Sequence, residues 1–410
     1  MIDRETAGQP GAPASEMPDN DPATLRALTA QAARVRAVFE GANYEPVDPP
    51  VLQPADVFLD RSGENIRRRM YLFADPSGAE LCLRPDLTIP TCRLFLARNP
   101  SASGDTRLSY QGSAFRYQTH APWPRREFTQ IGIERFGASD AEAADAEAMA
   151  LAIDAVRAAG LSDFRIEMGD LGLFGALVDV LDMPTAWRGR LKRHFWRPDY
   201  FRDLVERLVE GRAPSSGGVE QVGLFSALEA LDGNQSRAFI EEVLDLAGIS
   251  PVGGRSVGEI AERLLEQAAD AGAQAISTDV AELISDFLKV DCAPANAVEK
   301  IHGLTRAAAI SIEPQLEKLT RRLDLIEANG IDLSAARFST GFGRNMEYYT
   351  GFVFELCVAA PEGKLDIAGG GRYDGLLKSL GAPNCVPAVG CALIAERLLR
   401  AVRLENREDA

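Results

Sequence analysis

The chain has 410 residues, 46% of them hydrophobic and 25% charged, which is typical of a soluble globular protein long enough for two domains. Its formal net charge of −16 counts against a large nucleic-acid partner, because such binding relies on Lys and Arg side chains that neutralise phosphates. No apolar run reaches the roughly 20 residues that span a bilayer, and the N-terminal residues contain no signal-peptide core.

The first 170 residues alternate between helix and strand patterns. Residues 1–24 are rich in Pro, Ala and acidic residues and predict a disordered tail. A helix that ends at Gly41 follows, and a capping box, Ser139–Glu142, opens a second helix that ends at Gly160. Extended or alternating patterns predict strands at 44–54, at 71–88 (a hairpin around the turn 75–78), at 107–118 and 126–137 (joined by the loop 119–125), and at 164–170.

The rest of the chain is first helical and then returns to strands. Residues from about 170 to 330 have mostly helical patterns, with breaks at 213–218 and 250–256. Because strands at both ends enclose this helical block, the pattern predicts one α+β domain over 25–404 with a helical insertion. The later elements are strands at 336–342, 348–359 and 387–393, a last helix that ends near Leu404, and a short tail over 405–410.

One basic segment departs from the acidic balance of the chain. Over 187–202, WRGRLKRHFWRPDYFR, six basic residues interleave with aromatic residues. The segment could contact RNA or an acidic protein surface. A solvated helix face with its aromatic side chains turned inward is the favoured interpretation.

Cysteine and histidine give little support to a disulfide framework or a metal centre. The six cysteines form no Cys-x-x-Cys pair and most have apolar neighbours, which favours reduced core cysteines in a cytoplasmic protein. The three histidines, His120, His194 and His302, are isolated in sequence. A histidine-based metal site or a Ser-His-Asp triad therefore has little basis, and we expect no metal or cofactor.

Three consecutive glycines, Gly369–Gly371, stand out in DIAGGGRYDGLLKSLG over 366–381. Glycine loses more backbone freedom on folding than any other residue, so this run needs a physical reason. Taken alone, it favours a tight turn between a strand and a helix. The alternative is a backbone that another group must approach closely.

The strand at 126–137 carries a polar face. Period-two alternation puts Gln130 and Glu134 with Gly132 on one face, and Ile131 and Ile133 on the other. The isoleucine face is expected to be core. The polar face predicts either the floor of a pocket for a small polar ligand or a solvent-exposed sheet face, and this strand alone does not decide between them.

Three further fragments add polar groups. Alternation places Asp86 beside Thr88 in LRPDLT and Arg116 beside Gln118 in AFRYQ. In GRNMEYYTGFVFE an arginine precedes a tyrosine pair, and the phenylalanines alternate toward a core. Together the fragments offer carboxylates for an ammonium group, arginines for a carboxylate or phosphate, and tyrosines for a ring. That set fits an α-amino acid with a polar side chain.

These stretches, with AGGGRYDGLL…PAVGCALIAERL, resemble the catalytic core of histidyl-tRNA synthetases in order and spacing. The resemblance covers about 25–404 and is least clear in the helical block. YYTGFVFE and AGGGRYDGL are similar to the two histidine-specific signatures of that family. The resemblance implies a class II aminoacyl-tRNA synthetase-like antiparallel sheet flanked by helices, in which the glycines let the backbone approach bound histidine beside Tyr373.

The nucleotide-binding motifs of the synthetases are altered here. The family's F-R-x-E motif becomes FRYQ, which keeps Arg116 for the ATP α-phosphate but replaces the acid that meets adenine with Gln118. Pro124 stands where the motif 2 loop normally has its first arginine. The third motif keeps Arg397 but has Ile394 where glycine would admit the nucleotide.

A further difference concerns tRNA. The chain ends about six residues after its last predicted helix, where synthetases continue into an anticodon-binding domain of roughly 100 residues. With the acidic net charge, this predicts no tRNA partner. By contrast, the positions that the resemblance implies for binding histidine are kept, although Asp86 shortens the usual glutamate: Asp86, Thr88, Gln130, Glu134, Arg344, Tyr349 and Tyr373.

A synthetase core with altered ATP motifs and a kept histidine site resembles the regulatory subunits of ATP phosphoribosyltransferase. The resemblance implies a non-catalytic chain that works with a short-form catalytic subunit at the first step of histidine biosynthesis. It also implies a hetero-oligomer, usually an octamer of four regulatory and four catalytic chains, in which bound L-histidine transmits feedback inhibition.

Two other functions stay open at this point. A histidine-activating synthetase paralogue that acts on a non-tRNA acceptor is favoured by Arg116, Arg344 and Arg397. It is opposed by Gln118, Pro124 and Ile394. A pseudo-synthetase that senses uncharged tRNA is opposed by the missing anticodon domain and by the net charge. Histidine-dependent ATP–pyrophosphate exchange separates the first of these from the regulatory function.

Overall fold

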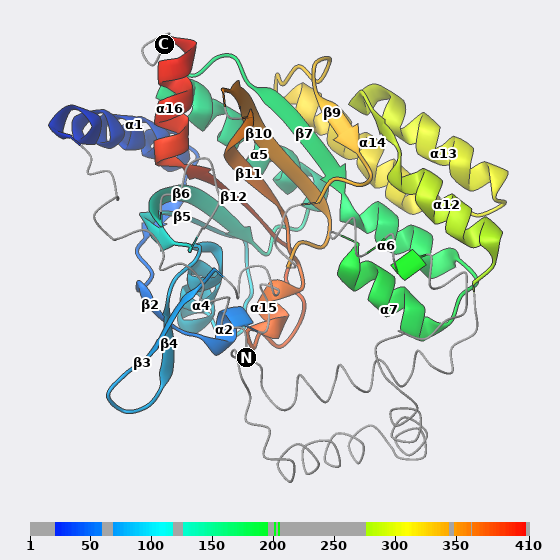
Figure 1. Cartoon of the computed structure of the whole chain (residues 1–410), viewed down its shortest axis with the longest axis horizontal. Helices are drawn as coiled ribbons and strands as arrows, with labels where there is room; N and C mark the ends of the chain where they lie inside the picture. The colour runs from blue at the N-terminus through cyan, green and yellow to red at the C-terminus, as the bar shows by residue number, and fades with distance from the viewer. Residues whose placement is uncertain are drawn as a thin grey trace, which may run out of the picture.

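The computed structural model describes residues 21–59, 69–117, 126–195, 201, 204–205, 276–343, 348–361 and 363–406. Its elements form a large central sheet with helices packed on it, a smaller sheet beside it and a separate group of helices (Figure 1). Most of the predicted N-terminal tail, the end of the C-terminal tail, the loop 119–125 and both breaks in the helical block lie outside the described residues.

The central sheet of the described chain has nine strands in the order β1-β5-β6-β12-β11-β10-β7-β9-β8. Neighbouring strands are antiparallel except for β1 with β5 and β7 with β9, so the predicted antiparallel sheet is confirmed with these two parallel exceptions. The bounds are β1 (Glu45–Val47), β5 (Thr106–Phe115), β6 (Glu127–Phe136), β7 (Arg165–Asp170), β8 (Asp291–Cys292), β9 (Arg337–Ser339), β10 (Phe352–Ala360), β11 (Gly363–Arg372) and β12 (Ala388–Ile394).

The two long N-terminal helices begin at aspartate caps. Before α1 (Pro22–Gly41), the side chain of Asp21 accepts hydrogen bonds from two backbone N–H groups, so the helix starts within the stretch predicted as a tail. At α5 (Ala141–Ala159), the cap is Asp140, which accepts from Ala143, and not Ser139 as the capping box predicted. Gly160, with φ 106°, ends α5 as predicted.

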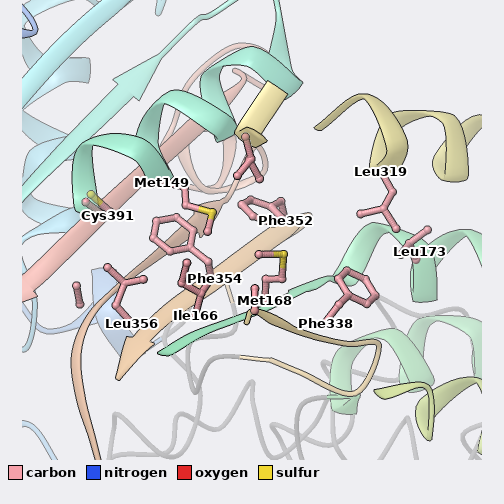
Figure 2. Close-up of a cluster of buried hydrophobic side chains, with 14 of the residues drawn as sticks. Met149, Ile166, Met168, Leu173, Leu319, Phe338, Phe352, Phe354, Leu356 and Cys391 are labelled. Carbon is pink, nitrogen blue, oxygen red and sulfur yellow. The ribbon is translucent and has the colours of Figure 1, made fainter. Parts of the chain in front are cut away.

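One face of the sheet is covered by α1, α5 and α16 (Ala395–Glu405) (Figure 1). Ile131 and Ile133 of β6 are buried in this layer, which confirms the predicted core face of the strand. Figure 2 shows part of the same core, where Met149 of α5 lies close to Phe354 of β10. Phe352 and Phe354 are fully buried and stacked at 5.9 Å, as their alternation predicted.

The opposite face is covered as well. The helices here are α2 (Asp56–Leu59), α4 (Thr88–Arg98) and α15 (Leu376–Ser379), and the small sheet has the order β2 (Leu52–Pro54), β4 (Glu80–Leu83), β3 (Tyr71–Ala74). The β3–β4 pairing confirms the predicted hairpin. Because Phe128 and Phe136 of β6 are buried on this side, the face with Gln130 and Glu134 is not exposed to solvent, and that alternative is wrong.

The helical block lies at one end of the sheet (Figure 1). The described aromatic residues of the basic segment, Trp187, Phe195 and Phe201, are at most 5% exposed, so these three turn inward as predicted. Trp196 and Tyr200 lie outside the described residues. The strand β8 lies within residues 170–330, so the helical block is not wholly helical. The described elements of the block besides β8 are α6 (Leu171–Val180), α7 (Thr185–His194), α12 (Thr278–Leu288), the 3-10 helix η2 (Pro294–Asn296), α13 (Ala297–Ala307) and α14 (Glu313–Ala328).

The three consecutive glycines lie inside β11, so their interpretation as a tight turn is wrong. A Cβ on Gly370 would lie 2.7 Å from Cβ of Cys391 on β12. A Cβ on Gly371 would lie 2.8 Å from Val353 and 3.0 Å from the Tyr349 ring. Neighbouring side chains therefore fill the space that side chains at these positions would take.

Two further expectations concern cysteine and the membrane. All six cysteines are free and four of them are buried, as expected for reduced core cysteines. Among the helices that the structure describes, none combines the length and apolarity needed to cross a membrane.

Candidate functional site

Glu134 lies at the centre of a buried polar group on the α4 side of the sheet. Its carboxylate accepts hydrogen bonds from the hydroxyls of Tyr110, at 3.1 Å, and Tyr373, and the Thr88 hydroxyl is a third partner. Glu134 and Tyr373 are each only 1% exposed. We call the whole group the Glu134 cluster, and its members are Asp86, Thr88, Tyr110, Gln130, Glu134, Tyr348, Tyr349 and Tyr373.

Two glycines make room for these side chains. Gly390 of β12 is paired with Glu134 of β6, and a Cβ there would overlap the Glu134 carboxylate. Gly132 is paired with Tyr110 of β5, and a Cβ there would lie 2.6 Å from the Tyr110 hydroxyl. Any side chain at either position would displace the carboxylate or the phenol, so the sheet register itself builds the site.

Asp86 and Thr88 reach the cluster from a turn and not from a strand. β4 ends at Leu83 and α4 begins at Thr88, so the predicted strand alternation is wrong there. Pro85, which has no N–H for a strand ladder, separates the two elements. Asp86 Oδ1 instead accepts a hydrogen bond from the backbone N–H of Ile89 at 3.2 Å. The turn thereby holds Asp86 and Thr88 against the sheet.

Asp86 offers an acceptor atom that the described part of the chain does not use. The residue is 1% exposed, and its Oδ2 has no hydrogen-bond partner among the residues that the structure describes. Leaving a buried acceptor unpaired costs free energy, so a ligand donor at this oxygen would be stabilising. Gln130 holds the same turn, because its Oε1 accepts from the Leu87 backbone N–H at 3.0 Å.

Three tyrosine rings form the wall of the cluster. The centroid of the Tyr348 ring lies 4.8 Å from that of Tyr349 and 5.6 Å from that of Tyr373, while Tyr349 and Tyr373 are 6.4 Å apart. The last two contacts are edge-to-face, the geometry that aromatic quadrupoles favour. An aromatic wall beside a carboxylate suits a flat ring that carries an N–H.

Burial raises the pKa of both carboxyl groups of the cluster, Glu134 and Asp86. It raises the pKa of Glu134 to about 7, against the opposing effect of hydrogen bonds from Tyr373, Thr88 and Tyr110. The nearby Asp86 charge raises the Glu134 pKa further. Burial also raises the pKa of Asp86, which Arg116 counteracts. A cationic ligand placed between the two carboxyl groups would favour their charged forms and would lower both pKa values.

The structure places the remaining predicted residues as follows. Arg116 lies beside the Asp86 turn, since its Nε donates to the Pro85 carbonyl at 2.7 Å and its guanidinium lies 5.2 Å from the Phe128 ring centroid. Arg397 is held elsewhere, because its Nη1 donates to the Asp366 carbonyl of β11 at 3.1 Å. Arg344, Gln118 and Pro124 lie outside the described residues.

Sequence reasoning missed Tyr110, and it noted Tyr348 only as one of a pair. Tyr110 lies in a stretch correctly predicted as a strand, but its part in the cluster depends on the β5–β6 register that sets it opposite Gly132. A signal was present in Gly132 itself, since a glycine within a strand often marks a close approach. The role of Gly390 likewise depends on strand register, because it follows from the pairing of Gly390 with Glu134.

The donor and acceptor set of the cluster suits an organic cation. Among the described residues, no three His, Cys, Asp or Glu side chains are placed to hold a metal ion. The cluster instead combines carboxylates, phenol hydroxyls and an amide. Such groups recognise an ammonium and a polar ring in a small, mostly enclosed site.

A cavity of about 690 Å³ lies elsewhere, between β7, β9 and α12. Its walls are largely apolar, with Ile284, Leu288 and Phe342 among them. The charged groups Glu167 and Arg337 on its wall are already paired, with Lys364 and Asp291. The Glu134 cluster is therefore the better candidate for a polar ligand.

Comparisons with known proteins place the fold. The family profile described as histidyl-tRNA synthetase matches residues 16–245 and 238–398. The chain resembles a solved "ATP phosphoribosyltransferase regulatory subunit/histidyl-tRNA synthetase" from Bacillus halodurans, with a TM-score of 0.64 and 21% identity over 98% of this chain and 84% of that one. A histidyl-tRNA synthetase from Nostoc gives a TM-score of 0.60 at 17% identity, over 98% and 76% of the two chains.

Sequence relatives are more specific. An ATP phosphoribosyltransferase regulatory subunit from Brucella anthropi is 35% identical over 365 residues, which span 89% of this chain and 95% of the relative. The protein of the same name from Mesorhizobium japonicum is 35% identical over 371 residues, or 90% and 96% of the two chains. The chain therefore belongs to the family of ATP phosphoribosyltransferase regulatory subunits, which share the histidyl-tRNA synthetase fold.

Proposed function

We propose that this chain is the histidine-sensing regulatory subunit of an ATP phosphoribosyltransferase, and that L-histidine binds at the Glu134 cluster. The observation that carries the proposal is a pair of almost fully buried carboxylates, Asp86 and Glu134, enclosed by hydroxyl groups and three tyrosine rings. The histidyl-tRNA synthetase fold, with an acceptor on Asp86 that is unpaired among the described residues, supports this choice of ligand.

The geometry supports a specific orientation of the ligand. Asp86 Oδ2, unpaired among the described residues, suits the α-ammonium group, which can donate up to three hydrogen bonds. Glu134 and Tyr373 lie against the aromatic wall and suit the imidazole N–H. This orientation gives the imidazole ring to Glu134 and leaves Asp86 as the carboxylate for the ammonium group.

The proposal includes a partner. The regulatory subunit works with a short-form catalytic subunit in a hetero-oligomer, an octamer of four and four chains, and carries no part of the active site. Bound histidine favours the less active state of the assembly, and by reciprocity the less active state binds histidine more tightly. No tRNA and no cofactor enters this function.

Reconstitution tests the function directly. The purified chain is mixed with a short-form ATP phosphoribosyltransferase, and transfer from phosphoribosyl pyrophosphate to ATP is measured with and without L-histidine. We expect the regulatory chain to be needed for full activity and for inhibition by histidine. Equal rates and equal inhibition with and without this chain would contradict the proposal.

One alternative function has a specific observation in its favour. Arg116 and Arg397, the arginines of two synthetase motifs, are both present, so the chain could activate histidine for a non-tRNA acceptor. Ile394 at the position of a nucleotide-admitting glycine opposes this. Histidine-dependent ATP–pyrophosphate exchange by the purified chain would favour the alternative.

A further inference from the structure

A buried ionic network lies on the face of the sheet opposite the Glu134 cluster. Its centre is Asp145 of α5, which is 0% exposed and pairs with Arg322 of α14 at 2.8 Å and with Arg372 of β11 at 2.7 Å. Arg322 also pairs with Asp170 of β7 at 2.7 Å, and Arg372 pairs with Asp374 at 2.9 Å. We call these five residues the Arg322 network. It joins α14, a helix of the helical block, to α5 and to two strands of the sheet, β7 and β11.

The network holds the backbone that carries two tyrosines of the cluster. Arg372 directly precedes Tyr373, and its carbonyl accepts a hydrogen bond at 2.8 Å from the N–H of Thr350, the residue after Tyr349. The N–H of Asp374 donates back to Thr350 Oγ1 at 3.1 Å. A displacement of Arg372 would therefore move Tyr349 and Tyr373 together.

Arg322, the residue of the network on α14, also contacts the chain segment that follows Tyr349. The guanidinium of Arg322 lies 5.2 Å from the ring centroid of Phe352, in the strand that follows Tyr349. Asp170, the other partner of Arg322, caps α6 by accepting from Gly172 at 2.8 Å. Beside it, the Leu171 N–H donates to the Gly351 carbonyl at 3.1 Å. Arg322 thus contacts α5 and β7 and stacks on β10, while α14 itself belongs to the helical block.

Burial gives these contacts a fixed geometry. Arg322 is 4% exposed, Arg372 5% and Asp170 7%. A buried carboxylate that loses an arginine is strongly penalised, so each of these pairs resists being broken. The arginine forks also fix direction, because the planar guanidinium binds only in a narrow range of orientations. Such a group can transmit a shift of α14 to the tyrosines without large motion elsewhere.

We propose that Arg322 is a positioning residue for the histidine site, and that the Arg322 network is the connection through which the helical block and the Glu134 cluster influence each other. The inference rests on the proposed function, because it takes L-histidine as the ligand of the cluster. Arg322 touches no ligand atom; it acts through Asp145 and Arg372 on Tyr349 and Tyr373. By reciprocity, histidine binding also stabilises the position of α14.

The chain offers a closely matched control. Arg321 is the neighbouring residue on α14, and it also forms two carboxylate pairs, with Asp140 and Glu142. Its side chain is 49% exposed, against 5% for that of Arg322. The variants Arg322→Met and Arg321→Met therefore remove the same group from the same helix, once inside and once outside the network.

The test is titration of the full chain with L-histidine. We expect the affinity of Arg322→Met to fall by about tenfold. Arg321→Met should stay within about twofold of the unmodified chain, and Arg322→Lys, which keeps the charge, should recover part of the loss. A purely structural role predicts instead that folded Arg322→Met binds normally, and that result would overturn the inference.

The histidine affinity of a double variant separates a specific connection from a general loss of stability. If Arg322 acts through Tyr373, then Arg322→Met combined with Tyr373→Phe should bind histidine within about twofold of Arg322→Met alone. Independent effects would multiply, and multiplied losses would overturn the inference.

Hydrogen exchange on the unmodified chain covers the case in which Arg322→Met does not fold. Saturating L-histidine should slow exchange of the amides of α14 and of the start of α6, while the β3–β4 hairpin changes little. Histidine binding with unchanged α14 exchange would overturn this inference and leave the proposed function standing. Absence of histidine binding by the unmodified chain would overturn both.

Discussion

Two groups of buried charges lie on opposite faces of the same sheet, and their carboxylates have different kinds of partner. In the Arg322 network, Asp145 is bracketed by two arginines at 2.8 and 2.7 Å. In the Glu134 cluster, Glu134 is held by hydroxyl groups, and Asp86 Oδ2 has no hydrogen-bond partner among the described residues. In the first group each carboxylate forms an ion pair with at least one arginine, so the group serves structure. The second keeps an acceptor that is unpaired among the described residues, as the proposed histidine site requires.

β11 connects the two groups. Its last residue, Arg372, points to the network, and the next residue, Tyr373, donates to Glu134. The stability of one group and the binding properties of the other therefore depend on the same few residues. Substitutions that separate stability from binding test this comparison.

The largest effect is expected from Asp145→Ala. Removing this carboxylate leaves two buried arginines each without one partner, which should lower the free energy of unfolding by about 3–5 kcal/mol. Asp154→Ala, an exposed position on the same helix, is the control and should change it by no more than about 0.5 kcal/mol. Urea unfolding followed by circular dichroism measures both. A loss below about 1 kcal/mol for Asp145→Ala would mean that the network does not stabilise the fold as its geometry indicates.

The next effect concerns the dependence of stability on pH. The folded pKa of Glu134, about 7, lies above its ordinary value of 4.5. The folded chain therefore binds this proton more tightly than the unfolded chain, and stability falls as pH rises from 4.5 through 7. The loss is about 3 kcal/mol, which Glu134→Gln should abolish because the amide does not titrate.

This prediction is checked by urea unfolding at about pH 5 and about pH 8 in the absence of ligand. Glu134→Gln should gain stability over the unmodified chain at the higher pH. Glu127→Gln, at an exposed position of the same strand, should follow the unmodified chain. Parallel pH profiles for all three proteins would show that Glu134 is charged in the folded chain without penalty.

A smaller effect is expected from removing one hydroxyl of the cluster. Tyr373→Phe or Tyr349→Phe should weaken histidine inhibition of the assembled enzyme by about 2- to 13-fold, the value of one hydrogen bond, with the uninhibited rate nearly constant. Tyr71→Phe, on the small sheet, is the control. If the uninhibited rate collapsed in a complex that stayed assembled, part of the active site would lie on this chain. An unchanged inhibition curve for both variants would remove the support for feedback through this site.

The sequence was a good guide to elements and a poor guide to register. The helix ending at Gly41, the β3–β4 hairpin and the strand 126–137 follow from local patterns, because caps, turns and alternation act over a few residues. Asp86 and Thr88 were correctly predicted to lie close together but were assigned to the wrong element. The error arises because a strand and a short turn both bring residues i and i+2 close together.

What local patterns do not determine is which strands lie side by side. The roles of Gly132 and Gly390 depend on pairings with Tyr110 and Glu134 over 22 and 256 residues of chain, respectively. The Arg322 network likewise joins residues of α5, β7, α14 and β11, which are far apart in sequence. Resemblance to a known family indicated the residues of the proposed histidine site before the structure did, but it could not indicate the network.

The central claim is that Glu134 and its neighbours bind histidine, and titration calorimetry tests it most directly. L-histidine is titrated into the unmodified chain, Glu134→Ala and Glu127→Ala, each shown to be folded by circular dichroism. The account predicts saturable binding by the unmodified chain and by Glu127→Ala. For Glu134→Ala it predicts an affinity roughly 10- to 150-fold lower, the loss of a charge-assisted hydrogen bond of about 1.5–3 kcal/mol. Equal affinity of the three proteins, or tight ATP binding with no response to histidine, would contradict it.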